Sequence, residues 1–209
     1  VTGSIVSNLC IPDLEEIIIP VVEGSQEEIA GLLAAINRKI QINCDVNDTL
    51  LQMAGALYLH RFFDRQANGK LADILIEHPK STIRVGEAKE AAGDFPFFTS
   101  GDAIYRWKTP LVEGRNCYLN TGGNAGVKFY VGRAAYSTDT WCITAENGLS
   151  DYLYLLLESI QPELQKKFFQ GTGLKHLQKP LLKERPVYIP TSDEGEAFYR
   201  EVGPWLTMI

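Results

Sequence analysis

The longest periodic pattern of hydrophobic positions lies in residues 24–64. Side chains of the predicted buried stripe recur there at alternating steps of four and three residues, the period of a coiled-coil seam. The seam positions are Ile29, Leu33, Ile36, Ile40, Asn43, Asn47, Leu50, Ala54 and Leu57. Ser25 is a suitable N-cap and Glu28 completes a capping box. The pattern therefore predicts one helix of roughly 60 Å, at about 1.5 Å per residue.

Two positions of the seam, Asn43 and Asn47, carry amides instead of apolar side chains. Amides in a coiled-coil seam lower stability but fix the register and the number of partners. The pattern therefore indicates a helix built to pair with one specific other helix. An ordinary amphipathic helix packed on a core is the alternative, and the pattern alone does not separate the two.

After the long helix the pattern changes to short strands, separated by turns rich in Gly, Asn, Ser and Asp. Strands are expected at 95–98, 103–105, 117–119, 127–131 and 140–143, with a further short strand at 82–85. Helices are expected at 71–76, 149–160 and 163–170, and a short one begins over 174–178. The predicted fold is α/β (α+β): a small, curved β-rich domain with flanking helices, joined to a long coiled-coil-type helix.

The formal charge of −6 is unevenly spread along the 209 residues. Residues 1–69 hold 4 basic and 9 acidic side chains (−5), residues 70–190 hold 15 and 13 (+2), and residues 191–209 hold 1 and 4 (−3). Only the middle segment could face an anion, and its margin is small for a DNA-binding domain. No run approaches the ~18 apolar residues of a membrane span, so no membrane partner is expected.

The cysteines at 10, 44, 117 and 142 and the histidines at 60, 78 and 176 are widely separated. No Cys-x-x-Cys pair occurs, which argues against structural zinc and against a disulfide framework. We therefore expect no metal and no cofactor. Such cysteine usage fits a reducing, cytoplasmic location.

The two ends of the chain share an order of features at a separation of 170 residues. The shift lays Thr2-Gly3 on Thr172-Gly173 and residues 17–20 on residues 187–190, each an apolar extended segment closed by Pro. Few of the aligned residues are identical, so the correspondence rests on the shared order of the features. We expect one period of a two-period protein followed by the beginning of the next, and thus a fragment or a trimmed product.

Several motifs, in their order and spacing, resemble the specificity subunit of type I restriction-modification systems. In the helix they are 26–29, Lys39-Ile40, the seam from Asn43 to Leu57, and Phe62-Phe63; in the β-rich part they are Gly86-Glu87, 95–97, 99–104, 122–126 and 171–176. The resemblance covers nearly the whole chain. It implies an end of a preceding repeat at 1–23, a conserved spacer helix at 24–66, a DNA target-recognition domain at 67–190, and the start of a second conserved helix at 191–209.

The resemblance also implies a protein without catalytic residues of its own. The family's subunit carries two target-recognition domains, each reading one half of a split double-stranded DNA target. Its two conserved helices pack antiparallel and hold methyltransferase (modification) subunits, and an endonuclease/translocase subunit joins the full complex. Only one recognition domain is complete here. The chain therefore either reads half a site alone or pairs with a second copy, as a homodimer through the long helix.

Reading DNA requires side chains that reach base edges and others that hold phosphates. The turn-rich domain and the 171–176 segment supply both kinds. The candidate DNA-binding residues are Ser100, Tyr105, Arg106, Lys108, Asn120, Asn124, Lys128, Arg133, Ser137, Thr138, Thr172, Lys175 and His176. Arg or Asn would make base contacts, while Lys, Ser and Thr would hold phosphates. The turn at 171–173, followed by Lys175 and His176, could present backbone amides of a helix start to a phosphate.

Two alternatives belong to other functional classes. The chain could be an oligomeric scaffold whose β-domain binds protein or carbohydrate, which the weak basic margin leaves open. Glu87 and Lys89, with Asp73, faintly suggest a metal-dependent nuclease, although the buried strand that such a site needs is missing from the pattern. The segment 122–128 lacks the Gly-Lys-Ser/Thr ending of a nucleotide-binding loop, so that function is rejected.

Overall fold

The computed structural model describes residues 25–209. The extended segment expected at 17–20 and the first half of the 170-residue correspondence lie outside the described residues. The chain divides into two compact units, one ending at Asp45 and one formed by Val46–Ile209.

The predicted long helix exists, and it runs as α2 from Gln26 to Tyr58. Acidic residues in its first turn favour this start, since they complement the positive end of the helix dipole. The pattern placed its end at residue 64, but the last turn, Leu59–Phe63, has the wider hydrogen bonding of a π-helix (η1).

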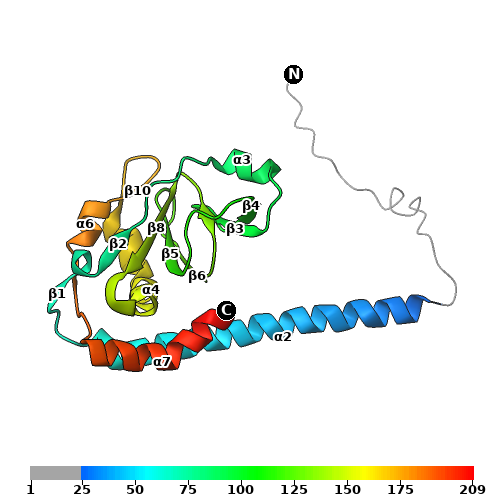
Figure 1. Ribbon diagram of the computed structural model, residues 1–209, viewed down its shortest axis with the longest axis horizontal. Coiled ribbons are helices and arrows are strands. Elements are labelled where there is room, and N and C mark those ends of the chain that lie inside the picture. The colour runs from blue at the N-terminus through cyan, green and yellow to red at the C-terminus, as the bar shows by residue number, and fades with distance from the viewer. Residues whose placement is uncertain (1–24) are drawn as a thin grey trace, which may run out of the picture. The chain divides into compact units, whose positions relative to one another are not determined.

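Helix α7, Ser192–Met208, runs antiparallel to the end of α2 and to η1 (Figure 1). Two ion pairs at 2.5 Å, Arg61 with Glu201 and Arg65 with Glu194, join the helices with opposite chain directions. Between them the Phe62 and Phe198 rings meet edge to face, with centroids 5.0 Å apart. A second helix was expected in this part of the sequence, and its packing here leaves Phe62 buried.

The centre of the β-rich domain is an antiparallel four-stranded sheet in the order β2, β8, β5, β6. Its strands are Leu75–Glu77, Thr140–Ala145, Arg115–Asn120 and Val127–Val131. Side chains alternate between the faces of a strand. Accordingly Cys117, Leu119 and Ile143 join the large core with helix α4, Ser150–Ser159, while Tyr118 and Cys142 join a second core on the other face.

A three-stranded sheet lies against that second core. It contains β4 (Ile104–Trp107), β3 (Phe95–Phe98) and β7 (Ala135–Tyr136), with β3 and β7 parallel. Phe98 faces the four-stranded sheet, where its ring stacks on Tyr118 at 4.0 Å, while Phe97 packs with Ala88 of helix α3, Val85–Glu90. The layers are therefore α4, four strands, three strands and α3 (Figure 1). The mixed fold expected from the sequence is confirmed.

The β-rich domain is joined to the helices by segments that lie next to each other. Strand β1, Gly69–Lys70, pairs antiparallel with β11, Pro186–Val187. Asn68 extends this contact, because its side chain bonds both the N–H and the carbonyl of Ile189. The remaining short elements are η2 (Leu71–Asp73), η3 (Glu146–Gly148), α5 (Gln161–Glu163), η4 (Leu164–Phe168), β9 (Phe169–Gln170), β10 (His176–Leu177) and α6 (Lys179–Lys183).

Four short elements differ from the sequence prediction. The helix predicted at 71–76 is one turn, η2, followed by β2, because Leu75–Glu77 finds a partner in β8. No strand forms at 82–85, where Glu87 accepts a hydrogen bond from the Arg84 N–H and thereby caps α3. The helix at 163–170 ends at Phe168, and 174–178 contains β10 instead of a helix, because β9 and β10 pair with each other.

Candidate nucleic-acid interface

Four loops of the β-rich domain meet at one edge, which we call the loop edge: residues 99–103, 121–126, 137–139 and 171–176. Backbone hydrogen bonds tie them together, from the Thr121 N–H to the Asp139 carbonyl (3.2 Å) and from the Gly123 N–H to the Lys175 carbonyl (2.9 Å). The Ser100 hydroxyl also accepts a bond from the Thr121 N–H at 3.2 Å. Loops far apart in sequence are thus fixed in one place on a rigid scaffold, the usual arrangement of a binding site.

Asn120 and Lys128 support the loop edge from inside. The Asn120 amide donates to the Asn124 carbonyl at 3.0 Å, and the Lys128 ammonium donates to Asn120 Oδ1 (3.2 Å) and to the Thr99 carbonyl (3.1 Å). Burial lowers the pKa of Lys128. These two residues were predicted as DNA contacts, but their polar groups are used within the domain, where they hold the shape of the loops.

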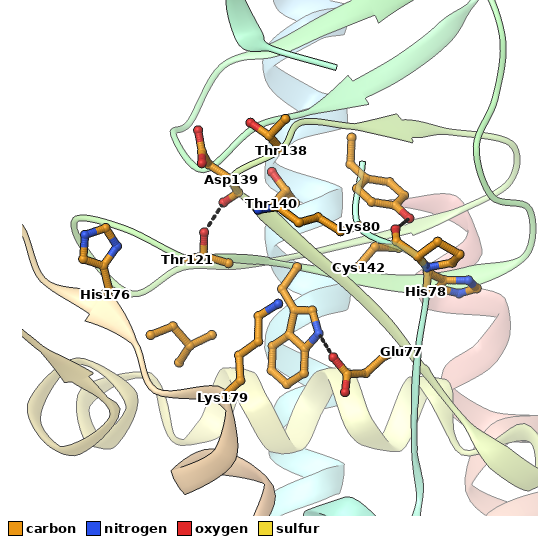
Figure 2. Close-up of a pocket in the computed structure, with 14 residues that line it drawn as sticks. Glu77, His78, Lys80, Thr121, Thr138, Asp139, Thr140, Cys142, His176 and Lys179 are labelled. Atoms are coloured by element: carbon orange, nitrogen blue, oxygen red, sulfur yellow. Dashed lines mark hydrogen bonds between the residues drawn. The ribbon is translucent and has the colours of Figure 1, made fainter. Parts of the chain in front are cut away.

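A pocket of about 400 Å³ opens beside the loop edge (Figure 2). It is bounded by the segment after β2, by the loop edge and by the segment from β10 to α6. Its walls are polar, with one indole ring among them. The lining residues are Glu77, His78, Pro79, Lys80, Thr121, Tyr136, Thr138, Asp139, Thr140, Trp141, Cys142, His176, Leu177 and Lys179.

The carboxylate of Glu77 is fully engaged at one side of this pocket. One of its oxygens accepts from Trp141 Nε1 at 2.7 Å, and the other pairs with Lys183. Burial raises the pKa of Glu77, but these hydrogen bonds outweigh burial and lower it overall. The ammonium of Lys179 lies 4.9 Å from the centre of the Trp141 ring. Its pKa is lowered, mainly by burial; the charge of Glu77 opposes this, and the charges of Lys80 and Lys183 lower the pKa further.

A second group of predicted residues lies on the three-stranded sheet. Arg106 donates to the Asp94 carbonyl at 2.8 Å, the Arg133 guanidinium lies 4.7 Å from the Phe95 ring centre, and Lys108 lies 5.7 Å from the ring of Trp107. Tyr105 is half-buried there, packed against the small core under α3. These residues form a basic strip, Arg106, Lys108 and Arg133, whose contacts tie it to this sheet and not to the loop edge.

Ser137 and the 171–176 segment require two corrections. Ser137 is fully buried and its hydroxyl bonds that of Thr140 at 2.9 Å, so it cannot touch a ligand at the surface. No helix begins after 171–173, so the expected phosphate site at a helix start is absent there. Thr172, Lys175 and His176 are instead exposed on a loop and a short strand.

Thr138 and His176 are the predicted residues that line the pocket, and Lys80, Lys179 and Thr121 join them there without having been predicted. Neither lysine belongs to a sequence motif or to a cluster of polar loop residues that would have indicated a site. Lys80 follows β2 and Lys179 is the first residue of α6, and the fold brings both to the lining of one pocket. A pattern read along the chain contains no signal of that proximity.

The helix-pairing residues divide between the two units. In the first unit the apolar seam is exposed: Ile29, Leu33, Ile36 and Ile40 are each 47–56% exposed, and Asn43 is exposed as well. In the second unit Ala54 is fully buried, and Asn47, Leu50 and Leu57 are half-buried. The end of the seam is therefore used within this chain, as in the core-helix alternative.

The two acids considered for a nuclease have local roles. Asp73 accepts from the Lys70 N–H at 2.7 Å and Glu87 from the Arg84 N–H at 3.0 Å, so each caps a short helix. Within residues 25–209, no three His, Cys, Asp or Glu side chains are grouped so as to hold a metal ion. Nor does that part of the chain contain a helix long and apolar enough to cross a membrane.

Comparison with solved structures shows the same fold in other proteins. The S subunit of a type I restriction-modification system from M. genitalium aligns with a TM-score of 0.62, at 17% identity over 98% of this chain. The HsdS subunit from Thermoanaerobacter tengcongensis aligns with a TM-score of 0.50, at 11% identity over 86% of this chain. A chain from a structural study of complex assembly in the type I R-M system also gives 0.50, at 14% identity over 90%.

This chain spans 60%, 49% and 52% of the lengths of those three proteins. A comparison with curated protein sequences gives no match. The family model described as the type I restriction modification DNA specificity domain matches residues 67–200, which is well over half of the sequence. The chain therefore belongs to the family of type I restriction-modification DNA specificity domains.

Proposed function

We propose that this protein binds double-stranded DNA sequence-specifically, as the specificity subunit of a type I restriction-modification complex, and reads one half of a split target. The observation that carries the proposal is the loop edge. It joins polar and basic side chains from four loops beside a pocket that contains two lysines. Family membership of residues 67–200 supports the same function.

The exposed side chains of the loop edge are suited to reading bases. Asn124 and His176 are exposed there and Thr138 is partly exposed. An Asn side chain can pair bidentately with adenine in the major groove, and Thr can contact either kind of base pair. The loops are short and tied to β strands, so the contact geometry is set before DNA binds.

We further propose that partner subunits carry out the catalysis. These are methyltransferase subunits docked at the helices and an endonuclease/translocase subunit in the full complex. The exposed seam from Ile29 to Ile40 supports a helical contact, because large apolar side chains repeat there along one face of α2. Its occupant would be the conserved helix of a second half or of a second copy. The complex would act in the cytoplasm, where its DNA lies.

The test is to co-express the chain with the methyltransferase subunit encoded beside it and to map adenine methylation across the host genome by long-read sequencing. One new motif is expected. A palindromic motif would mean that two copies act together, and a one-sided motif would mean that one copy reads alone. An assembled complex that produces no new methylation would contradict DNA recognition and favour the scaffold alternative.

Variants then locate the reading surface. Asn124→Ala with His176→Ala should abolish or relax the motif at the loop edge. Arg106→Ala with Arg133→Ala removes two charges from the basic strip and serves as the comparison. If only the Arg106→Ala with Arg133→Ala pair changes the motif, the DNA interface lies on the three-stranded sheet, and the assignment of base reading to the loop edge is wrong.

A further inference from the structure

We infer that the pocket beside the loop edge is a phosphate-binding site in which Lys80 and Lys179 together hold one phosphate group of the DNA backbone. The inference rests on the proposed function and assigns a distinct task within it. The loop edge would read bases, while the pocket would fix the position of the strand. Phosphate contacts of this kind set register and orientation but carry no sequence information.

The first argument is the balance of charge in the pocket. Figure 2 shows the side chains of Lys80 and Lys179 extending into it from different parts of the chain. Glu77, the acid whose charge acts on Lys179, is bonded to Lys183 and Trp141. Within the described residues, no carboxylate lies within ion-pair distance of Lys80 or Lys179. Two ammonium groups that form no direct ion pair therefore line one concave surface, and the charge of Glu77, which raises the pKa of Lys179, is shared with Lys183 and Trp141.

Asp139 is the other acid of the lining, and its exposure to solvent screens its charge. Its side chain is exposed, while its carbonyl accepts hydrogen bonds from Thr121. His78 is engaged as well, since its ring nitrogen Nε2 bonds Asn116 Oδ1 at 2.7 Å. The cationic groups left to meet a phosphate in this pocket are the two lysines.

The second argument is the placement of Lys179 on Trp141. Trp141 is 3% exposed, so its ring forms a rigid wall, and the Lys179 ammonium lies 4.9 Å from the ring centre. This contact holds the ammonium in one place, which lowers the entropy lost when a ligand binds. A fixed point charge in a polar pocket is suited to phosphate, which lysine binds without requiring bidentate geometry.

The experiment measures DNA affinity as a function of salt. Each phosphate contact contributes about −0.9 to the slope of log K against log salt. The wild-type chain and the pair Lys80→Met with Lys179→Met are titrated against a fluorescent 30-base-pair duplex between about 50 and 200 mM salt. Met keeps the apolar stem, so the packing on Trp141 survives. The matched control is Lys89→Met with Lys166→Met, which removes two exposed lysines that lie outside the pocket.

The pocket pair, Lys80→Met with Lys179→Met, should flatten the slope of log K against log salt by one to two units, on the order of one per lysine. Lys80→Arg with Lys179→Arg should restore the wild-type slope. The control pair should leave the slope unchanged. If pocket and control pairs have the same slope as wild type while wild type binds the duplex, the inference is overturned and the proposed function stands. Equal flattening by both pairs would also overturn it, because the effect would then be general electrostatics.

A second readout needs no DNA and separates the two sources of phosphate. With Trp107→Phe and Trp205→Phe, Trp141 is the only remaining tryptophan, and its fluorescence is titrated with inorganic phosphate. Quenching that is abolished by the pocket pair, together with a changed DNA slope, supports a backbone phosphate. Quenching with an unchanged slope would assign the pocket to a free phosphate ligand, and the absence of both effects would remove the site altogether. A wild-type chain that binds no duplex would contradict the proposed function and the DNA assignment together.

Discussion

The ion pair between Arg115 and Asp151 gives the sharpest stability prediction. Arg115 Nε donates to Asp151 Oδ1 at 2.8 Å, and the Asp151 side chain is 1% exposed. The other carboxylate oxygen, Oδ2, is buried and has no hydrogen-bond partner. The same guanidinium donates to the Gly203 carbonyl and to the Thr207 hydroxyl of α7. One side chain thus neutralises a buried carboxylate and joins the sheet to α7.

Arg115→Met keeps an apolar stem and removes the charge. It leaves Asp151 buried without its partner, and breaking a buried pair in this way costs about 3–5 kcal/mol. For a domain of this size that loss lowers Tm by roughly 6–20 °C, at about 2–4 °C per kcal/mol. The assay is urea unfolding followed by circular dichroism. Arg106→Met, which removes an exposed guanidinium bonded only to a backbone carbonyl, should change stability by no more than about 0.5–1 kcal/mol.

The pH dependence supplies an independent check. Burial raises the pKa of Asp151 above its ordinary value, although Arg115 partly opposes this. A carboxyl whose folded pKa is raised favours folding when it is protonated, and this contribution is lost as pH rises through the folded pKa. Without Arg115 the folded pKa rises further, so the deficit of Arg115→Met should shrink as pH falls from 7.5 toward 4.5, and Asp151→Asn should recover part of it. A deficit below about 1 kcal/mol, or one that grows on acidification, would refute the reasoning.

Two further predictions concern the backbone. Gly93→Ala would place a Cβ 2.2 Å from the backbone of Trp107, which cannot move cheaply, so we expect a loss of about 2 kcal/mol or more in urea unfolding, whereas Gly86→Ala meets nothing within 4 Å and should be neutral or slightly stabilising. Thr191→Ala removes the N-cap of α7, whose hydroxyl accepts from the Glu194 N–H, and should cost about 1 kcal/mol; an unchanged unfolding midpoint for Thr191→Ala would show that α7 does not depend on its cap.

The sequence predicted well where a pattern is local and repeated. The long helix follows from its seam, and the strand Val127–Val131 follows from the apolar run that turns enclose. Elements whose state depends on a distant partner were missed. Leu75–Glu77 becomes a strand only because β8 offers it an edge, and His176–Leu177 only because β9 lies opposite.

The candidate site shows the same division. Asn124, Thr138 and His176 were predicted because loops with polar side chains stand out in the sequence, and the structure leaves them at least partly exposed at the loop edge. Lys128 was predicted to contact DNA because nothing local reveals that its ammonium reaches the Thr99 carbonyl, which follows β3 of the other sheet. Lys80 and Lys179 were overlooked because an isolated lysine has no pattern. Whether a side chain is buried or bonded depends on distant parts of the folded chain, so residue type and sequence position alone do not predict it.

The adjacent strands β1 and β11 have a consequence for how such proteins diversify. The chain leaves the helices at Asn68 and returns at Ile189, and those two residues are hydrogen-bonded to each other. A segment whose ends meet in this way can be replaced by another of different length without changing the separation of the helices. If the domain reads DNA as proposed, a new specificity could be acquired by exchanging the segment between these two residues, provided that the incoming segment forms the same pair of strands.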